Sequence, residues 1–440
     1  FEVRSKHYET KACLATSNKK QKTRNKLLSQ IANISSKFSP AGLRDKTRGD
    51  KVIWAIVVVL SLVSLLVVYS ATNSLAYKLY KGNTLVYLFK QIAFITLGII
   101  IVYFAHRVNY TIYSRVAKML FYISIVLLIY TLFFGAKIND GSRWIKLPII
   151  NLTVQTSDIA KLALFMYLSR LLSKKQDVIK DFKKGFLPLM MPIVIICGLI
   201  APANLSTALL TGATSMLLLF IGRVSFKHIA LVGAAVAVPV IILISIAGAY
   251  YDKAEGKTKE LPAVLSAGRI PTWIKRVQDF MYAAKSEAPY QVQQAKIAVA
   301  KGGMFGLGPG NSEQRNFLPH PYSDYIYAII IEEYGLIGAS FIVFIYMVFL
   351  FRSIRLFRKC PYAFGAFLAL ALSFTLVIQA MTNMAVNVGL FPVTGVTLPL
   401  VSMGGSSFLF TCLAIGIILS VARNVEDAEG SLEPAKEELV

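Results

Sequence analysis

The residues with the clearest capacity for chemistry lie where polar segments of the chain meet long apolar stretches. Asp324 stands in LPHPYSDYIYAIIIEEYGLIG, where a proline-containing segment gives way to an apolar stretch that predicts a helix. A carboxylate at such a boundary can have a raised pKa and serve as a general base. Aspartate is also a common helix N-cap, so a catalytic and a capping role both remain open. Glu332 and Glu333 lie two turns further on, and their position favours a partner cation or a wet cavity.

A second polar group opens another predicted helix, in QTSDIAKLALF. We expect Ser157 to cap this helix, with Asp158 in its first turn and Lys161 one turn further in. Ser157 and Lys161 are four positions apart and therefore share a helix face. The lysine either extends to a membrane interface or binds a pyrophosphate, since an intramembrane charge usually has a function. Two residues upstream are of the types that meet lipid headgroups, Arg143 and Trp144.

Two glycine-rich segments could bring the backbone close to an anion. The segment 387–407 carries no charge, and its prolines and glycines exclude a regular helix. Such backbone persists at membrane depth only where it is buried in protein or lines a cavity, so both a structural re-entrant loop and an anion site remain open. The candidate anion donors open the next predicted helix: Gly404, Gly405, Ser406 and Ser407. GGMFGLGPG (302–310) predicts either a tight turn between short helices or a close approach to a phosphate-bearing lipid.

The elements that must position these residues are membrane-spanning helices. Hydrophobic residues make up 55% of the 440 residues and charged residues only 16%, against about 25% charged in soluble domains. A soluble fold of this size could not cover so much apolar surface, so we predict an all-α integral membrane protein with about ten transmembrane helices. The apolar stretches are 52–71, 84–105, 116–135, 158–173, 186–201, 206–222, 228–250, 324–351, 362–385 and 406–423.

The distribution of charge predicts how the chain is oriented and divided. Alternate connections hold 15 Lys and Arg on one side against 5 on the other, which predicts that both termini are cytoplasmic. The large loop 251–323, between helices 7 and 8, is then extracytoplasmic. Residues 1–50 form a basic tail that we expect to be disordered, 51–423 a membrane domain, and 424–440 an acidic cytoplasmic tail. No aromatic interleaving in the basic tail supports a nucleic-acid partner, and the spacing of the four cysteines and four histidines favours no metal site.

Several segments together resemble the SEDS family (shape, elongation, division and sporulation proteins), over about residues 50–425. The closing segment is more similar to the cell-division branch of this family than to its rod-shape branch. The chain departs from the common family pattern at Asn204, where many members have Asp, and at His320, where Glu is frequent. The matching segments are GSRWI (141–145), QTSDIAKLAL (155–164), NLSTALL (204–210), YQVQQAKIAVAKGGMFGLGPG (290–310), LPHPYSDYIYAIIIEEYGLIG (318–338) and NVGLFPVTGVTLPLVSMGGSS (387–407).

The resemblance implies a peptidoglycan glycosyltransferase of the cytoplasmic membrane that polymerises lipid II outside the cell membrane. It works with a class B penicillin-binding transpeptidase and, for a division role, with other divisome proteins. The transfer inverts the anomeric centre and releases undecaprenyl pyrophosphate, with Asp324 as the expected base. A divalent cation, Mg²⁺ or Mn²⁺, is left open as a helper. The expected substrate contacts are Arg143, Trp144, Ser157, Lys161, Arg315, His320, Ser402, Gly404, Gly405 and Ser406.

Three alternatives stay open at the level of sequence. A lipid II flippase or polyprenyl-lipid transporter would favour charges through both leaflets and inverted repeats, and neither is evident. A scaffold without catalysis would not need the retained Asp324. A rod-shape role could replace the division role. For the partner, we expect a lipid-facing groove on spans eight and nine, formed by small residues at Gly335, Gly338, Ala339, Gly365 and Ala366.

Overall fold

The computed structural model is predominantly helical. It describes residues 49–72, 84–138, 141–146, 153–252, 257–259, 261–262, 265–266, 269–282 and 290–437. The chain divides into two units, Phe1–Lys51 and Val52–Val440, and every element below belongs to the second apart from the first residue of α3. The predicted basic tail 1–50 therefore lies almost wholly outside the described residues.

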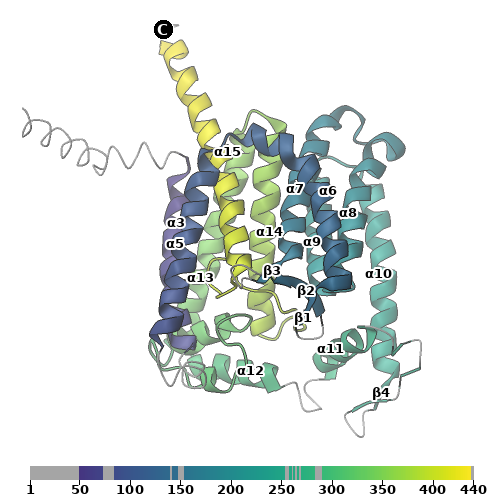
Figure 1. The fold of residues 1–440 in the computed structure, drawn as a ribbon, viewed down its shortest axis with the longest axis vertical. Coiled ribbons are helices and arrows are strands. Elements are labelled where there is room, and N and C mark those ends of the chain that lie inside the picture. Colours follow the sequence, from purple (N-terminus) through teal and green to yellow (C-terminus); the bar gives the residue numbers. More distant parts are fainter. Residues whose placement is uncertain are drawn as a thin grey trace, which may run out of the picture. The chain divides into compact units, whose positions relative to one another are not determined.

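A helix coincides with each of the ten predicted apolar stretches (Figure 1). Within the described residues, eight helices are long and apolar enough to cross a membrane, which supports a multi-pass membrane protein. The apolar helix α9 is shorter, and α7 is not among the eight, so the full set of ten spans stays a prediction. The ten helices are α3 (Lys51–Ala71), α5 (Leu85–Arg107), α6 (Tyr110–Phe134), α7 (Thr156–Lys174), α8 (Leu187–Ile200, after the π-helical turn Phe182–Phe186), α9 (Leu205–Ile221), α10 (Phe226–Ala249), α13 (Ile326–Lys359), α14 (Ala363–Asn387) and α15 (Ser406–Glu437).

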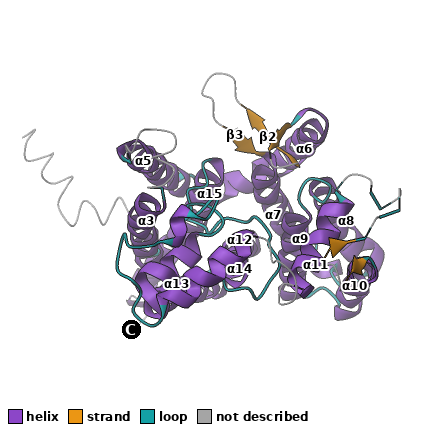
Figure 2. Cartoon of the chain, turned by 90° about the horizontal axis from the view of Figure 1, so that it is seen from below, coloured by secondary structure: helices purple, strands orange, loops and turns teal. Residues whose placement is uncertain are grey.

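Helix α14 lies at the centre of this helical unit. It packs against α13, α7, α15 and α9, and Figure 2 shows it surrounded by other helices. In its most apolar window 78% of the residues are buried, whereas none is buried in the corresponding window of α10. Alanines at 366, 369 and 371 let neighbouring helices approach closely, because small residues allow dense packing between membrane helices. Polar residues on α14 are therefore held within the protein rather than against lipid.

The prediction of a purely α-helical fold is wrong in one detail. Three short strands form an antiparallel sheet in the order β1 (Ala136–Ile138), β2 (Gly141–Lys146) and β3 (Thr153–Gln155). The predicted interfacial segment GSRWI is strand β2, and β3 runs directly into α7. Buried backbone amides and carbonyls that lie outside a helix still need hydrogen-bond partners, and the pairing of the strands supplies them. A second pair joins β4 (Tyr251–Asp252) to β5 (Lys257–Thr258).

The large loop contains its own helices. α11 (Ile270–Tyr282) packs against α10, and α12 (Tyr290–Gly302) packs against α13. Buried Gln278 of α11 donates hydrogen bonds to the carbonyls of Ala247 and Tyr250 at the end of α10, at 2.9 and 3.3 Å. A 3₁₀ turn, η3 (Gln314–Asn316), follows before the chain enters α13. The loop thus carries rigid elements close to the start of α13.

The glycine-rich segment Gly302–Gly310 forms the predicted tight turn, and it lies against a break in α13. Gly335 interrupts that helix with φ 67° and ψ −169°. The amide of Leu307 donates to the carbonyl of Glu332 at 2.9 Å. A Cβ at Gly335 would lie 2.3 Å from the carbonyl oxygen of Met304, so only glycine fits this approach. The close backbone contact of this segment is therefore with the protein's own broken helix.

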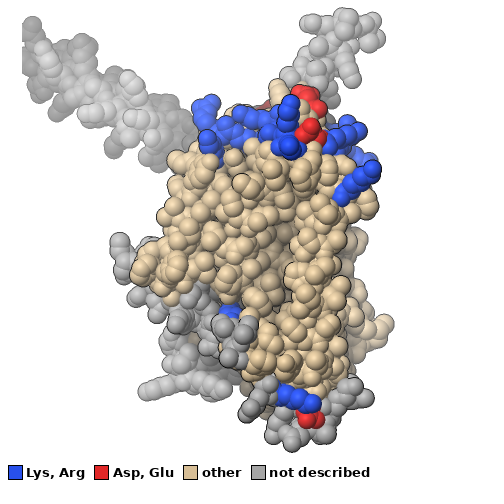
Figure 3. Space-filling view, turned by 90° about the vertical axis from the view of Figure 1, so that its right-hand side faces the viewer, with Lys and Arg blue, Asp and Glu red and all other residues tan. Residues whose placement is uncertain are grey.

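Charge gathers at the ends of the helices. Figure 3 shows many Lys and Arg side chains at one end of the face in view and a largely uncharged surface between its two ends. This pattern agrees with the charge asymmetry of the connections, which predicts that the basic end faces the cytoplasm.

The predicted groove of small residues on α13 and α14 is wrong. Ala339 and Ala366 are buried, and a Cβ at Gly365 would contact Cys360 and Tyr110 inside the protein. These small residues serve internal packing, because close helix contacts need them there. The exposed face of α13 is instead bulky and includes Leu336, Ile337, Phe341, Phe344 and Phe351.

Candidate functional site

Asp324 lies at the boundary of α13, as predicted, but two residues before the first helical residue and outside the N-cap position. The residue before the helix is Tyr325, which makes no side-chain cap hydrogen bond. The Asp324 side chain is half-buried, and its Oδ1 accepts a hydrogen bond from the Ser323 hydroxyl at 3.0 Å. The N-cap position of α13 is therefore Tyr325 and not Asp324.

Two asparagines of α14 hold the backbone of Asp324. The side-chain amides of Asn383 and Asn387 each donate to its carbonyl oxygen at 2.9 Å. The Asn387 Oδ1 atom accepts from the amide of Ala328 at 3.1 Å, in the first turn of α13, and shares this N–H with the carbonyl of Tyr325. Both asparagines are about 1% exposed. Asp324 is therefore fixed by the neighbouring helix rather than by its own segment.

The uncharged loop between α14 and α15 surrounds the same position. The Ser402 hydroxyl donates to the carbonyl of Ser323 at 2.7 Å, and the amide of Met403 donates to the carbonyl of Tyr322 at 2.9 Å. At Gly395, with φ +65°, a Cβ would stand 3.7 Å from Asp324 Oδ2. The loop is non-helical from residue 388 to 405, as predicted. Glycine at 395 keeps this side of the carboxylate open.

The predicted Asp158 and Lys161 pair is present one helix away. Lys161 Nζ lies 2.8 Å from Asp158 Oδ1 and 3.5 Å from Gln379 Oε1. The other carboxylate oxygen of Asp158 accepts from the Ser407 hydroxyl. These side chains line a cavity of about 40 Å³ between α7, α14 and α15. The lysine charge is thus balanced within the protein.

Ser157 lies in the first turn of α7, and its predicted capping role is wrong. The helix begins at Thr156 and its N-cap residue is Gln155. The side-chain amide of Gln155 donates to the Ser157 hydroxyl at 2.9 Å, and the backbone amide of Gln155 donates to the Ser406 hydroxyl at 3.2 Å. Strand pairing places half-buried Trp144 opposite Gln155. Gly404 and Gly405 precede Ser406, the first residue of α15, as predicted, and Arg143 lies in β2 with its side chain outside the described part.

A polar stripe on α14 connects these two groups. Gln379, Asn383 and Asn387 follow at intervals of four residues and therefore lie on one face of the helix. Gln379 accepts from Lys161 and donates to the carbonyl of Thr397 at 3.0 Å, while the asparagines hold Asp324. Sequence analysis missed this stripe, although amides four residues apart in an apolar helix are a detectable signal.

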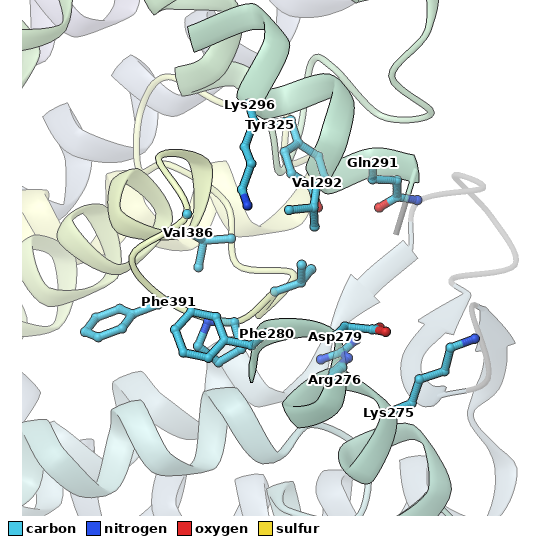
Figure 4. A pocket seen from close by; sticks show the side chains of 13 residues that line it. Lys275, Arg276, Asp279, Phe280, Gln291, Val292, Lys296, Tyr325, Val386 and Phe391 are labelled. Atoms are coloured by element: carbon cyan, nitrogen blue, oxygen red, sulfur yellow. The ribbon is translucent and has the colours of Figure 1, made fainter. Parts of the chain in front are cut away.

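A larger cavity, of about 430 Å³, lies between α11, α12, Tyr325 and the end of α14 (Figure 4). Its lining includes three cations that sequence analysis also missed, Lys275, Arg276 and Lys296. Burial and the charge of Arg269 lower the pKa of Arg276, whereas Tyr325 and Asp324 oppose this shift. The carboxylate of Asp324 therefore lies within electrostatic range of the cavity.

Arg315 and the two glutamates form a separate group near the end of α3. Arg315 Nη1 donates to the Ser70 hydroxyl at 2.9 Å, and that hydroxyl in turn donates to Glu333. Glu332 accepts from the Ser312 hydroxyl and from the backbone amides that open η3. Glu333 is thus linked to Arg315 through the Ser70 hydroxyl, whereas Glu332 is bound by a hydroxyl and backbone amides. Within the described residues, Arg315 lines neither of the two cavities above.

His320 lies at the surface of the loop. It is exposed, and its Nδ1 stands 3.4 Å from the hydroxyl of Tyr322. Tyr322 contacts the loop that surrounds Asp324, because the Tyr322 carbonyl accepts a hydrogen bond from the backbone amide of Met403. The structure thus brings His320 to the rim of the site rather than beside the carboxylate.

These features define a class: a multi-pass membrane protein in which buried amides hold the backbone of one aspartate next to a cavity lined by cations and apolar side chains. Residues 50–427 match the family model described as "Cell cycle protein", that of FtsW, RodA and SpoVE. The chain belongs to this family, as the sequence resemblance predicted.

Individual relatives match over nearly their full length. The chain is 33% identical to the probable peptidoglycan glycosyltransferase FtsW of Trichlorobacter lovleyi, covering 88% of this chain and 96% of that protein. It is also 33% identical to the stage V sporulation protein E of Bacillus subtilis, covering 86% and 98%.

Solved structures share the fold at lower identity. A chain from a study of the "structural coordination of polymerization and crosslinking by a peptidoglycan synthase complex" matches with TM-score 0.67 and 22% identity, covering 86% of this chain and 98% of that one. The rod shape determining protein RodA of Thermus thermophilus matches with TM-score 0.59 and 20% identity, covering 86% and 97%.

Proposed function

We propose that this protein is a peptidoglycan glycosyltransferase that polymerises lipid II into glycan strands at the outer face of the cytoplasmic membrane during cell division. The observation that carries the proposal is Asp324, whose backbone is held by Asn383 and Asn387 next to Tyr325, a residue that lines the cationic cavity. Relatives named peptidoglycan glycosyltransferase FtsW support the activity, and the cell-cycle description of the family supports the division role.

Asp324 acts as the general base in this mechanism. It takes the proton from the 4-hydroxyl of one lipid-linked GlcNAc as that oxygen attacks the anomeric carbon of MurNAc on a second molecule. The bond to undecaprenyl pyrophosphate breaks and the anomeric centre inverts. The Ser323 hydroxyl orients the carboxylate, and the two asparagine amides fix its backbone. A positioned base contributes about 10²- to 10⁴-fold in rate.

The other residues predicted to contact the substrate would surround the reacting groups. Lys161, balanced by Asp158, and Arg143 remain our candidates for electrostatic contact with the departing pyrophosphate. Arg315 instead contributes to the packing of α3 against α13 through Ser70. Other proposed substrate contacts are Trp144, Ser157, His320, Ser402, Gly404, Gly405 and Ser406.

A divalent cation would have to be shared with the substrate. Among the described residues, no group of three or more His, Cys, Asp or Glu side chains is arranged to hold a metal ion. Mg²⁺ is commonly bound through one or two carboxylates together with substrate phosphates. Asp279, which lines the larger cavity, is a carboxylate that could share Mg²⁺ or Mn²⁺ with a pyrophosphate. Such an ion would neutralise charge on the leaving group.

The partner that we propose is a class B penicillin-binding transpeptidase, together with other divisome proteins. A structural neighbour comes from a complex described as coordinating polymerization and crosslinking. The bulky exposed face of α13 offers apolar surface at which a single transmembrane helix could pack. Co-purification of the two proteins, with α13 substitutions at Phe341 and Phe344, tests this interface.

The decisive test of function is polymerisation of lipid II by purified protein and partner. We expect wild-type protein to form glycan polymer, and Asp324→Asn to fold normally while losing polymer formation. Asp181→Asn is the matched control, because Asp181 caps a turn far along the chain through the amide of Lys184. A folded Asp324→Asn protein with near wild-type activity would refute the assignment of the base. A protein that moves lipid II across vesicles but forms no polymer would refute the proposed function.

The proposed orientation has its own test. A single cysteine at Ser266, in the large loop, should react with an impermeant thiol reagent added outside the cell. A cysteine within 174–184 should react only after the membrane is opened. Reversed labelling would place the site on the cytoplasmic side.

A further inference from the structure

The two cavities near the site differ in how their positive charges are balanced. The cavity of about 40 Å³ contains Lys161, whose charge is paired with Asp158. The cavity of about 430 Å³ contains three cations and one carboxylate, Asp279. No ion pair joins Arg276 or Lys296 to a carboxylate within the part of the chain that the structure describes. The larger cavity therefore has an excess of positive charge.

Arg276 and Lys296 approach this cavity from two different helices. Figure 4 shows the Lys296 side chain extending from α12 into the space that faces Arg276 on α11. A Cβ at Gly389, where φ is +79°, would lie 3.3 Å from Lys296 Cε, so the glycine leaves room for the lysine stem. Lys275 points away from Lys296 in the same view. The two cations that share the cavity are thus Arg276 and Lys296.

Much of the remaining lining of the cavity is apolar. It includes Phe280 from α11, Val292 from α12, and Val386, Phe391, Pro392 and Val393 from the end of α14 and the following loop. Half-burial of Arg276 beside Arg269 is unfavourable without a counter-charge, because burial disfavours charged groups and like charges repel. Cations beside an apolar lining suit an anion that is attached to a less polar group.

We propose that Arg276 and Lys296 form an anion-binding subsite for the lipid-linked saccharide substrate, separate from the Lys161 and Asp158 pair. This inference rests on the proposed function. The anion is one of the negatively charged groups of the substrate, and two groups have the required chemistry: its pyrophosphate and the carboxylates of its stem peptide. Tyr325, which follows Asp324 in the chain, lines the same cavity, so either group would lie near the reacting hydroxyl.

Binding of inorganic pyrophosphate to the purified full-length chain tests the subsite without any turnover. We expect Arg276→Gln and Lys296→Gln each to weaken binding by about 10-fold, because each loses a charge-assisted contact. Arg276→Lys, which keeps the charge, should retain more affinity than Arg276→Gln. Lys301→Gln is the matched control, since Lys301 lies on the same helix but pairs with Glu313. We expect this control to bind as the wild type does.

Kinetics with two forms of lipid II identify the anion. If the subsite holds the pyrophosphate, Arg276→Gln and Lys296→Gln should raise the KM equally for lipid II with free and with amidated stem carboxylates. If it holds the carboxylates, the two variants should raise the KM only for the free form. Either result supports the subsite. Variants that match Lys301→Gln in both pyrophosphate binding and KM overturn it.

The two experiments also separate this inference from the proposed function. A wild-type chain that forms no polymer, but binds pyrophosphate through Arg276 and Lys296, refutes the glycosyltransferase proposal and keeps the subsite. Polymer formation with unchanged binding and KM in both variants keeps the function and refutes the subsite. Thermal unfolding of each variant identifies any that fail to fold, and Arg276→Lys then decides the role of that position.

Discussion

Removing the side-chain amide of Asn387 should both misplace Asp324 and destabilise the helical unit. Asn387→Ala removes donations to the carbonyls of Asp324 and Asn383, at 2.9 and 2.8 Å, and one of the two acceptors of the Ala328 amide, which keeps its bond to the Tyr325 carbonyl. Three hydrogen bonds at about 1 kcal/mol each would give about 3 kcal/mol. Side-chain hydrogen bonds between membrane helices average nearer 0.6 kcal/mol, so we expect a loss of about 2–3 kcal/mol.

Activity should fall further than stability alone explains. A displacement of a catalytic group by about 1 Å can cost about 10²-fold in rate. Because Asn383 still donates to the carbonyl of Asp324, each single alanine variant should keep part of the activity. The double variant Asn383→Ala/Asn387→Ala leaves that carbonyl without either donor, so its loss should exceed the product of the single effects. A coupling of about 0.5–3 kcal/mol is typical of residues that share a partner.

The assay combines lipid II polymerisation with unfolding measured in detergent. Ser373→Ala is the matched control, because Ser373 is buried on the same helix and donates only to the carbonyl of Ala369 within it. This control should lose about 1 kcal/mol of stability and keep its activity. Purely additive effects of the two asparagine variants, or folded variants with wild-type activity, would refute the role of α14 in positioning Asp324.

Three further predictions concern stability, measured by thermal unfolding. Gly335→Ala should lower the free energy of unfolding by more than about 2 kcal/mol, since its φ is 67° and a Cβ would meet backbone; Gly198→Ala, with open space around it, should be neutral or stabilising. Lys161→Met leaves buried Asp158 unpaired and should cost about 3–5 kcal/mol, whereas the double variant with Asp158→Asn should recover much of that loss. Glu332→Ala leaves the amides at the start of η3 without this acceptor and should lower the free energy of unfolding by about 1–3 kcal/mol. An unchanged free energy of unfolding would mean that other contacts hold the turn.

The length and spacing of apolar runs were enough to predict the class of fold. Each of the ten stretches is helical because a run of apolar residues must satisfy its own backbone inside a bilayer, and a helix does so locally. Prolines and glycines predicted the irregular loop before α15 for the same local reason. The position of Asp324 at a helix boundary, the Asp158 and Lys161 pair and the membership of the family also followed from the sequence.

Local rules failed where a partner from elsewhere in the chain supplied the missing hydrogen bond. Aspartate before a helix predicts a cap, yet the first turn of α13 is capped by Asn387, which is 59 residues away from Ala328. Ser157 is the predicted cap of α7, but the helix starts two residues earlier than this cap predicts, because β3 runs straight into it. Arg315 donates to Ser70, 245 residues away, and no sequence pattern links the two.

The sequence by itself therefore determined which segments form apolar helices and which residue types stand at their ends, because those properties depend on neighbours along the chain. Only the tertiary structure decided that α14 holds Asp324 through two asparagines. It also decided that Arg276 and Lys296 meet in one cavity, from helices that belong to the same polar loop. Both results depend on which surfaces pack together, and packing is set by the shape and burial of the whole helical unit rather than by any one segment.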